Sequence, residues 1–305
     1  MTQVTQFQFG LVHAPLTPFI DGKLDLATFE KSIRFHVAAG ADALAIQTHT
    51  GESVSLPVDE RKKLLELAIA TAGTTPIIAN VSEAGTGIAC DLARHARLAG
   101  AKAMIACVPY YWTPPDAMLV EHFAAIAEAG ELPLFLYNSP HEMNNVKIKT
   151  PVAMALVGRS TFIAGLIDVS MDWQFMIEVI AEAKRIGSNF QLISGTEYMI
   201  SAHATGATGL LSPVANIAPA LIRRLYDLCA QERYPEAHQA QVDAAFLYRL
   251  FDEHGVAGLK VGSKLMARDC GQARPPLPVM DGEIVDDIAR EMNKVASLTQ
   301  EKRGW

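Results

Sequence analysis

Three side chains that can transfer protons lie just beyond apolar segments of this chain. His49 and Thr50 follow an apolar run over residues 42–47, and Tyr137 lies at the end of another over residues 133–138. An imidazole, a hydroxyl and a phenol can each accept, donate or relay a proton. The same pattern is also typical of a buried tyrosine or a loop histidine whose polar atoms find protein partners. We therefore treat these three residues as candidate catalytic residues.

The ends of two further apolar segments, and one polar loop, supply candidate ligand-binding groups. Ile167 and Asp168 end one segment, Ser194 and Gly195 end the next, and Glu142 lies in the loop. A carboxylate such as Glu142 can bind a cationic or polyhydroxy ligand, but it also occurs as an exposed loop residue. Asp168 can equally brace its strand end through hydrogen bonds.

A weak internal repeat indicates the elements that carry these residues. Residues 38–47, 98–107 and 204–213 each combine the end of a helical pattern, a glycine and an apolar strand. Glycine just past a helix end adopts the left-handed cap conformation without steric cost. The strands are apolar throughout, as expected when both faces are buried. Eight such strands are predicted, near residues 8–14, 42–47, 76–81, 102–108, 133–138, 162–168, 190–194 and 208–212.

Helical patterns alternate with these strands, which predicts an α/β fold: a (β/α)8 TIM barrel followed by a C-terminal helical extension. Phe29, Ile33 and Val37, for example, share one helix face after a predicted N-cap at Asp25. A doubly wound sheet is the alternative, but the chain lacks the Gly-x-Gly-x-x-Gly turn that would support a nucleotide site. In a (β/α)8 barrel the active site lies at the C-terminal ends of the strands, where the candidate residues fall.

The last quarter of the chain has only helical patterns. We assign residues 1–232 to the barrel and residues 233–305 to a helical extension packed on it. Residues 274–278 (Arg-Pro-Pro-Leu-Pro) form a connector because prolines cannot continue a helix. The helices of the extension are predicted near residues 234–253, 256–268 and 282–298.

Composition favours a cytoplasmic enzyme that acts on a small molecule. Half of the residues are hydrophobic and 19% are charged, which predicts a sizeable core. The net charge of −7 argues against nucleic acid and anionic membrane partners. No run approaches the roughly 18 apolar residues that a membrane span needs. The N-terminal residues 1–6 lack the pattern of a secretory signal.

The sequence predicts no cofactor and no metal site. Its cysteines lack the C-x-x-C spacing of a zinc or redox centre. A metal site would require His13, His49, His141, Glu142 and Asp168 to meet at the barrel mouth, and no pair of them has a compact ligand spacing. A phosphate site at the last two strands is a further alternative, but the glycines there have no basic partner.

Several motifs, in a fixed order along nearly the whole chain, resemble those of the dihydrodipicolinate synthase / N-acetylneuraminate lyase family. Thr-His-Thr-Gly-Glu at 48–52 is similar to the family's Gly-Thr-Thr-Gly-Glu, and Tyr-Asn-Ser-Pro at 137–140 matches its Tyr-Asn-x-Pro. Further similarity lies in residues 14–19, 109–111 and 206–216. The resemblance implies the barrel fold and a homo-oligomer, either a dimer or a tetramer.

The resemblance also implies roles for individual residues. The family has a lysine at the position of Ile167, which forms a Schiff base with pyruvate or a related 2-oxo acid. A tyrosine placed like Tyr137 shuttles protons, and a tyrosine placed like Tyr111 joins the relay from a neighbouring subunit. A threonine hydroxyl and backbone amides, placed like Thr50 and Gly51, bind the keto acid carboxylate.

This chain departs from the family pattern at three of those places. Ile167 has no amine, His49 replaces the first threonine, and Glu142 stands near the position of an arginine that holds a second carboxylate in some members. The sequence therefore predicts a lyase that uses Tyr137 for proton transfer on a small carbonyl or hydroxy acid compound, without a Schiff base. The alternative is a non-catalytic ligand-binding or regulatory member, which the missing lysine also favours.

Overall fold

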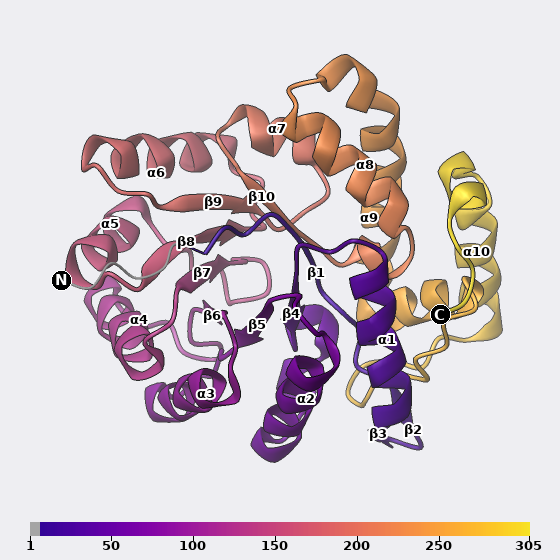
Figure 1. Cartoon of the computed structure of the whole chain (residues 1–305), viewed down its shortest axis with the longest axis horizontal. Helices are drawn as coiled ribbons and strands as arrows, with labels where there is room; N and C mark the ends of the chain where they lie inside the picture. Colours follow the sequence, from indigo (N-terminus) through magenta and orange to yellow (C-terminus); the bar gives the residue numbers. More distant parts are fainter. Residues whose placement is uncertain (1–6) are drawn as a thin grey trace.

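Eight apolar segments form parallel strands that close into a barrel, in the order β1, β4, β5, β6, β7, β8, β9, β10 and back to β1 (Figure 1). The computed structural model describes residues 7–305. The strands are β1 (Leu11–His13), β4 (Ala43–Ile46), β5 (Ile77–Asn80), β6 (Ala103–Cys107), β7 (Leu134–Asn138), β8 (Ile163–Asp168), β9 (Gln191–Ser194) and β10 (Gly209–Ser212). The predicted (β/α)8 barrel is confirmed, and each strand lies within its predicted segment.

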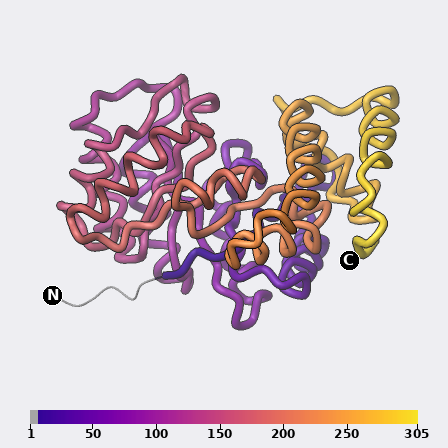
Figure 2. Tube along the Cα trace, turned by 90° about the horizontal axis from the view of Figure 1, so that it is seen from above, coloured from indigo at the N-terminus to yellow at the C-terminus, as the bar shows by residue number. Residues whose placement is uncertain are grey.

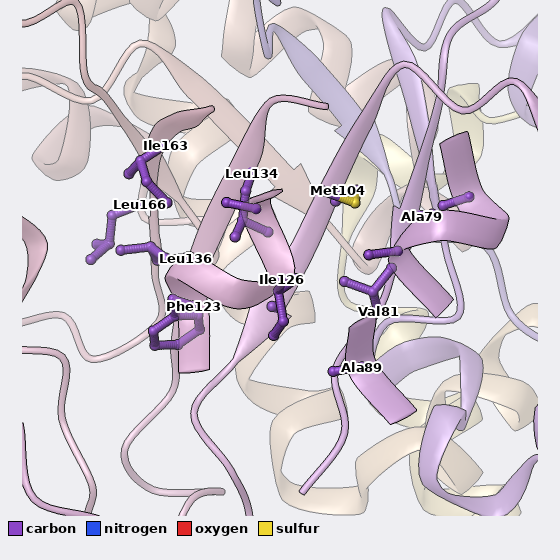
Figure 3. Close-up of a cluster of buried hydrophobic side chains, with 14 of the residues drawn as sticks. Ala79, Val81, Ala89, Met104, Phe123, Ile126, Leu134, Leu136, Ile163 and Leu166 are labelled. Atoms are coloured by element: carbon purple, nitrogen blue, oxygen red, sulfur yellow. The ribbon is translucent and has the colours of Figure 1, made fainter. Parts of the chain in front are cut away.

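Helices surround the barrel because most outward-facing residues of the strands are apolar. Met104, Leu134 and Leu136 point away from the barrel axis and pack with Phe123 and Ile126 of a covering helix (Figure 3). The covering helices are α1 (Leu26–Ala38), α2 (Val58–Thr71), α3 (Thr86–Ala99), α4 (Asp116–Gly130), α5 (Thr150–Arg159), α6 (Trp173–Arg185), α7 (Met199–Ala204) and α8 (Pro219–Ala230).

Local sequence signals set the start of α1 and the loop before it. The side chain of Asp25 accepts a hydrogen bond from the backbone N–H of Thr28 at 3.0 Å, so the predicted N-cap is confirmed. A short hairpin, β2 (Phe19–Ile20) and β3 (Lys23–Leu24), precedes this helix. The backbone N–H of Phe19 in this hairpin donates to the carbonyl of Cys270 at 3.0 Å, so the chain between β1 and α1 contacts the extension.

The barrel interior is filled by a second apolar cluster. Ile78, Ile105, Phe135, Ile167 and Ile193 point inward from successive strands and are buried. Such side-chain layers make a barrel interior a packed core and leave space only at its mouths. Any ligand site in this fold must therefore lie at the strand ends and the loops that follow them.

Two long helical elements make up most of the extension, α9 (Tyr234–Leu265) and α10 (Gly282–Met292), followed by the short 3-10 helix η4 (Ala296–Gln300). Figure 2 shows α9 and α10 gathered on one side of the barrel. The backbone of α9 breaks at Gly255, with φ 60° and ψ −160°, which separates the two predicted helices there. These angles are accessible only to glycine.

The prediction of one helix over residues 282–298 is wrong beyond Met292. The chain turns at Asn293, a weak helix former, and Val295 is buried. Val295 belongs to an apolar cluster in which Leu11 and Leu210 of the barrel pack with Phe251 and Ile288 of the extension.

The extension therefore shares a core with the barrel. The division of the chain at residue 232 remains a prediction.

Within the described residues, no helix is long and apolar enough to cross a membrane. The N-terminal segment 1–6, predicted not to be a secretory signal, lies outside the described residues.

Candidate active site

A cavity of about 330 Å³ opens at the C-terminal mouth of the barrel, between the strand ends and α9. It lies where barrels of this class place their active sites. Its lining consists of Ala14, Thr48, His49, Thr50, Tyr137, Glu142, Val169, Gly195, Leu211, Pro213, Val214, Tyr248, Phe251, Asp252, Gly255, Val256 and Leu259. The cavity thus combines an apolar wall with several hydroxyl and carboxyl groups.

A second, smaller cavity of about 60 Å³ adjoins the first. Thr48, His49, Tyr137 and Glu142 line both cavities, so these four side chains form the boundary between them. Across this boundary His49 Nδ1 lies 3.2 Å from Glu142 Oε1. Glu142 is fixed from its other side by Ser139, whose hydroxyl donates to Glu142 Oε2 at 2.9 Å. We call these two spaces the larger and the smaller cavity.

The loop that carries His49 and Thr50 is held at its start by Gln47. This residue adopts φ 61°, in the left-handed region that non-glycine residues rarely enter. Gln47 Nε2 donates to the carbonyl of Arg61 at 2.6 Å, and Asn80 Nδ2 donates to the carbonyl of Gln47. These two partners hold the backbone in a conformation that would otherwise cost free energy.

Glu52 fixes the end of the same loop. It also adopts a left-handed conformation, with φ 57°, and its carboxylate is buried. Lys260 Nζ of α9 lies 2.7 Å from Glu52 Oε1, and the backbone N–H of Arg274 donates to Glu52 Oε2 at 2.8 Å. Lys260, which lies within the helix predicted near residues 256–268, thus braces the site loop.

Arg61 of α2 braces the end of β5, although the strand-end residues themselves include neither lysine nor arginine. Its buried guanidinium donates to the carbonyl of Asn80 at 2.8 Å and to that of Ser82 at 3.1 Å. It also pairs with Glu83 at 2.9 Å. Tyr110 donates to the other carboxylate oxygen of Glu83 at 2.9 Å. Arg61 thus positions the wall of the smaller cavity without lining it.

Tyr137 lies at the centre of the mouth, on the boundary between the two cavities. Burial raises the pKa of its phenol well above the ordinary value of 10, and the carboxylate of Glu142 raises the pKa further. The phenol therefore stays protonated at neutral pH. Such a group can donate a hydrogen bond or a proton to a ligand oxygen.

The structure brings only part of the predicted site together. His49, Thr50, Tyr137, Glu142 and Gly195 line the larger cavity. The other predicted site residues, Gly51, Tyr111, Ile167, Asp168 and Ser194, are not among those found to line either cavity in the described part of the chain.

Three of these remaining residues have internal partners. Asp168 accepts hydrogen bonds from Asn138 at 2.6 Å and from the hydroxyl of Ser170 at 2.8 Å, and burial raises the pKa of its carboxyl. Ser194 donates to the carbonyl of Thr196 at 2.7 Å. Gly51 donates its backbone N–H to the carbonyl of Thr48 at 3.0 Å. These bonds support a bracing role for these residues, and ligand binding by them remains a prediction.

Tyr111 points outward from the rim. It is 79% exposed, has a strained φ of 74°, and packs edge-to-face on Trp112 at 5.1 Å between ring centroids. Trp112 is itself 60% exposed. Two large aromatic side chains exposed side by side are typical of a protein interface.

Six residues of α9 line the larger cavity and were missed by the sequence analysis. The residues, which cover the mouth from above the strand ends, are Tyr248, Phe251, Asp252, Gly255, Val256 and Leu259. No local motif marks them, because the helical pattern of residues 234–253 shows only that one face is apolar. Their place follows from how α9 packs on the barrel.

No cluster of three or more potential metal ligands occurs within residues 7–305. His13, one of the residues considered for a metal site, turns away from the mouth and contacts His36 of α1, with 3.1 Å between their Nδ1 atoms.

The comparisons with known proteins agree with this geometry. The dihydrodipicolinate synthetase family matches residues 8–295 of the chain. The chain is 31% identical to a 4-hydroxy-tetrahydrodipicolinate synthase of Roseobacter denitrificans, over 90% of this chain and 94% of that one. A protein of the same name from an Azoarcus species is 33% identical, over 93% and 97%. The chain belongs to the dihydrodipicolinate synthetase family.

Solved structures of the same family confirm the fold. Dihydrodipicolinate synthase from Aquifex aeolicus superimposes with a TM-score of 0.89 at 27% identity, covering 94% of this chain and 98% of that one. The enzyme of that name from Thermotoga maritima superimposes with a TM-score of 0.90 at 23% identity, covering 95% and 100%.

This dihydrodipicolinate synthetase family member has a hydrocarbon side chain beside its central tyrosine. Ile167 of β8 is the register partner of Tyr137 of β7 and has no exposed surface. It packs in the barrel interior with Phe135 and Ile193. An isoleucine cannot form an imine, so any chemistry at this mouth must use the groups that surround the two cavities.

Proposed function

We propose that this family member is a lyase that acts on a small carbonyl or hydroxy acid compound without a Schiff base at residue 167. The observation that carries the proposal is the place of Tyr137. Tyr137 lines both cavities, together with His49 and Glu142. A protonated phenol at a barrel mouth can donate a hydrogen bond to a ligand oxygen, and a proton once negative charge develops there.

His49 and Glu142 supply the complementary base in this proposal. The carboxylate of Glu142 lies 3.2 Å from His49 Nδ1, and we assign the role of acceptor to the other ring nitrogen, Nε2. His49 Nε2 then accepts a proton from the substrate, while Tyr137 donates one to the oxygen on which negative charge develops. Thr50, which also lines the larger cavity, orients the substrate.

The proposal is tested by screening and substitution. Small carbonyl and hydroxy acid compounds are screened for a rise in melting temperature, since a ligand that binds only the folded state stabilises it. Compounds that bind are then incubated with the protein and their products are analysed. Tyr137→Phe should lower turnover by roughly 100-fold or more. Tyr226→Phe, in a tyrosine that donates to the carbonyl of Thr208 away from the mouth, should leave turnover unchanged. Equal turnover in both variants would refute the role of Tyr137.

A non-catalytic ligand-binding or regulatory function is the second candidate, and the hydrocarbon at Ile167 favours it. A pocket that has lost its nucleophile can still bind a ligand as a sensor. Under this alternative, calorimetry detects tight binding while the ligand is recovered unchanged. Detection of a converted product excludes the alternative.

We also propose that the chain forms a homo-oligomer. The support is the exposed Tyr111 and Trp112 pair at the rim of the mouth. In this arrangement Tyr111 contacts the mouth of a neighbouring subunit, as its place in the family pattern implies.

A further inference from the structure

Three polar side chains that line only the smaller cavity, Asn80, Ser82 and Tyr110, are hydrogen-bonded within the protein. Asn80 donates to the carbonyl of Gln47 and accepts from the hydroxyl of Ser82 at 2.6 Å. Ser82 in turn accepts from the backbone N–H of Cys107 at 2.9 Å, and Tyr110 donates to Glu83 at 2.9 Å. These lining side chains are therefore already paired with protein atoms.

The remaining wall of the smaller cavity is largely apolar. It is formed by Val54, Ile105, Cys107 and Met143, together with the polar Ser53. Burial raises the pKa of the Cys107 thiol to about 11, so this thiol is uncharged at neutral pH. A polar guest would lose its hydration here without gaining new partners, whereas an alkyl group would lose only contact with water.

The boundary between the cavities is polar. Thr48 is 5% exposed, and its hydroxyl has no hydrogen-bond partner among the atoms of residues 7–305. Thr48 lines both cavities, as Tyr137 does. A buried polar atom without a partner costs free energy unless a ligand or water supplies one. The boundary is thus the place where a polar ligand atom fits.

We propose that the ligand of this protein spans both cavities and is an unbranched carbonyl or hydroxy compound with a short, uncharged alkyl end. Its carbonyl or hydroxyl oxygen lies at the boundary, within reach of Thr48 and Tyr137. Its alkyl end enters the smaller cavity, and its polar remainder occupies the larger one near Thr50. The proposal deepens the function proposed above and rests on it for the identity of the reacting oxygen.

The carboxylate of Glu142 at the boundary favours ligands with an uncharged end over ligands with an anionic end. A ligand with a carboxylate at its far end would bring that charge next to Glu142 and into an apolar space. Both effects disfavour binding, through repulsion and loss of hydration. Thr48, His49 and Glu142 are also positions at which the chain departs from the family motifs. These three residues therefore all lie at the entrance to the smaller cavity.

The test compares three 2-oxo acids by saturation-transfer NMR, which measures binding without turnover. Pyruvate lacks the alkyl extension, 2-oxopentanoate carries two more methylene groups, and 2-oxoglutarate has the same chain length but a terminal carboxylate. We expect 2-oxopentanoate to bind roughly tenfold more tightly than pyruvate, the gain for burying two methylene groups. Its terminal methyl should receive the strongest saturation. We expect 2-oxoglutarate to bind no more tightly than pyruvate.

Two variants locate the alkyl end. Cys107→Leu adds two non-hydrogen atoms to the wall of the smaller cavity, and Val54→Trp fills it from an exposed rim position that tolerates substitution. Each should remove the advantage of 2-oxopentanoate and leave pyruvate binding unchanged. The proposal is overturned if 2-oxopentanoate fails to bind or shows no advantage, or if its advantage survives in a folded variant.

Failure of the proposed catalytic function is distinguishable from failure of this inference. If the protein converts none of the compounds but shows the expected order of affinities, the two-cavity site stands and the lyase function falls. If it converts a compound whose affinity does not depend on the alkyl end, the lyase function stands and the two-cavity site falls.

Discussion

Tyr137 and Ile167 are register partners on β7 and β8, so the phenol at the centre of the mouth has a hydrocarbon as its strand neighbour. A cationic amine at residue 167 would lower the pKa of an adjacent phenol by stabilising the phenolate. With isoleucine there, the main charged influence on Tyr137 is the carboxylate of Glu142, which raises its pKa. Isoleucine at this position therefore supplies neither a nucleophile nor a positive charge that would lower the pKa of the phenol.

The first prediction concerns imine formation. Incubation with pyruvate and borohydride should leave no covalent adduct on this chain, because the mouth offers no amine at residue 167. Ile167→Lys should restore an adduct, since a lysine buried at this position has a lowered pKa and a larger fraction of neutral amine. Intact-protein mass spectrometry measures both results.

Ile167→Met serves as the control for imine formation, because it keeps an apolar side chain of similar volume. An adduct on the unmodified chain, located by peptide mapping at the barrel mouth, would show that another amine reaches the site.

The second prediction concerns the buried pair of Lys260 and Glu52, which ties α9 to the loop of His49. Burial lowers the pKa of Lys260, whereas the nearby Glu52 carboxylate opposes this shift. Lys260→Met leaves Glu52 buried without its cation and should lower the free energy of unfolding by about 3–5 kcal/mol. Urea unfolding measures the change.

The double variant Lys260→Met with Glu52→Gln is the matched control. It removes the uncompensated charge, so it should be more stable than Lys260→Met alone. A single variant that loses less than about 1 kcal/mol would show that the pair does not hold the loop.

The third prediction concerns acid stability and the buried histidines behind β1. His36 Nε2 donates to Asn216 Oδ1 at 3.1 Å, so His36 Nδ1 accepts from His13 Nδ1 and both rings are neutral. Burial, opposed by the hydrogen bond to Asn216 and reinforced by the charge of Arg268, lowers the pKa of His36 to about 3. Burial, His36 and Arg223 lower the pKa of His13 well below its usual value.

Because both histidine pKa values are lower in the folded state, the unfolded chain binds more protons below about pH 6.5. Stability should therefore fall as the pH drops, by roughly 1.4 kcal/mol per pH unit for each histidine. Unfolding free energies measured from pH 7 to pH 5 test this slope. His36→Gln should reduce the slope, and His238→Gln, at an exposed residue, should not. An unchanged slope in His36→Gln would contradict the assignment.

The fourth prediction concerns assembly. Light scattering should give a dimer or tetramer, and Trp112→Glu should shift the population toward the monomer by placing a charge in the contact. Leu98→Glu is the control, because Leu98 is 77% exposed on α3 and lies outside the aromatic pair. A monomeric natural chain, or equal effects of both variants, would refute the proposed interface.

The barrel was predictable because its signals are local. Glycines past the helix ends, apolar runs such as Leu134–Asn138 and the N-cap at Asp25 depend on residues close together in sequence. Because such a barrel places its active site at the strand ends, the sequence also predicted that His49, Thr50 and Tyr137 lie at one mouth. The absence of an amine at Ile167 is likewise a property of the sequence alone.

The tertiary structure decided which of these residues share a cavity. Tyr248 and Asp252 cover the mouth, Lys260 braces Glu52, and Glu142 meets His49 across the boundary. These contacts join residues far apart in the sequence. Those of Tyr248, Asp252 and Lys260 depend on how α9 packs over the strand ends, and that of Glu142 with His49 depends on how the loops after β7 and β4 meet. A local pattern specifies an element and its buried face, whereas the partner of that face is set only when the whole chain is packed.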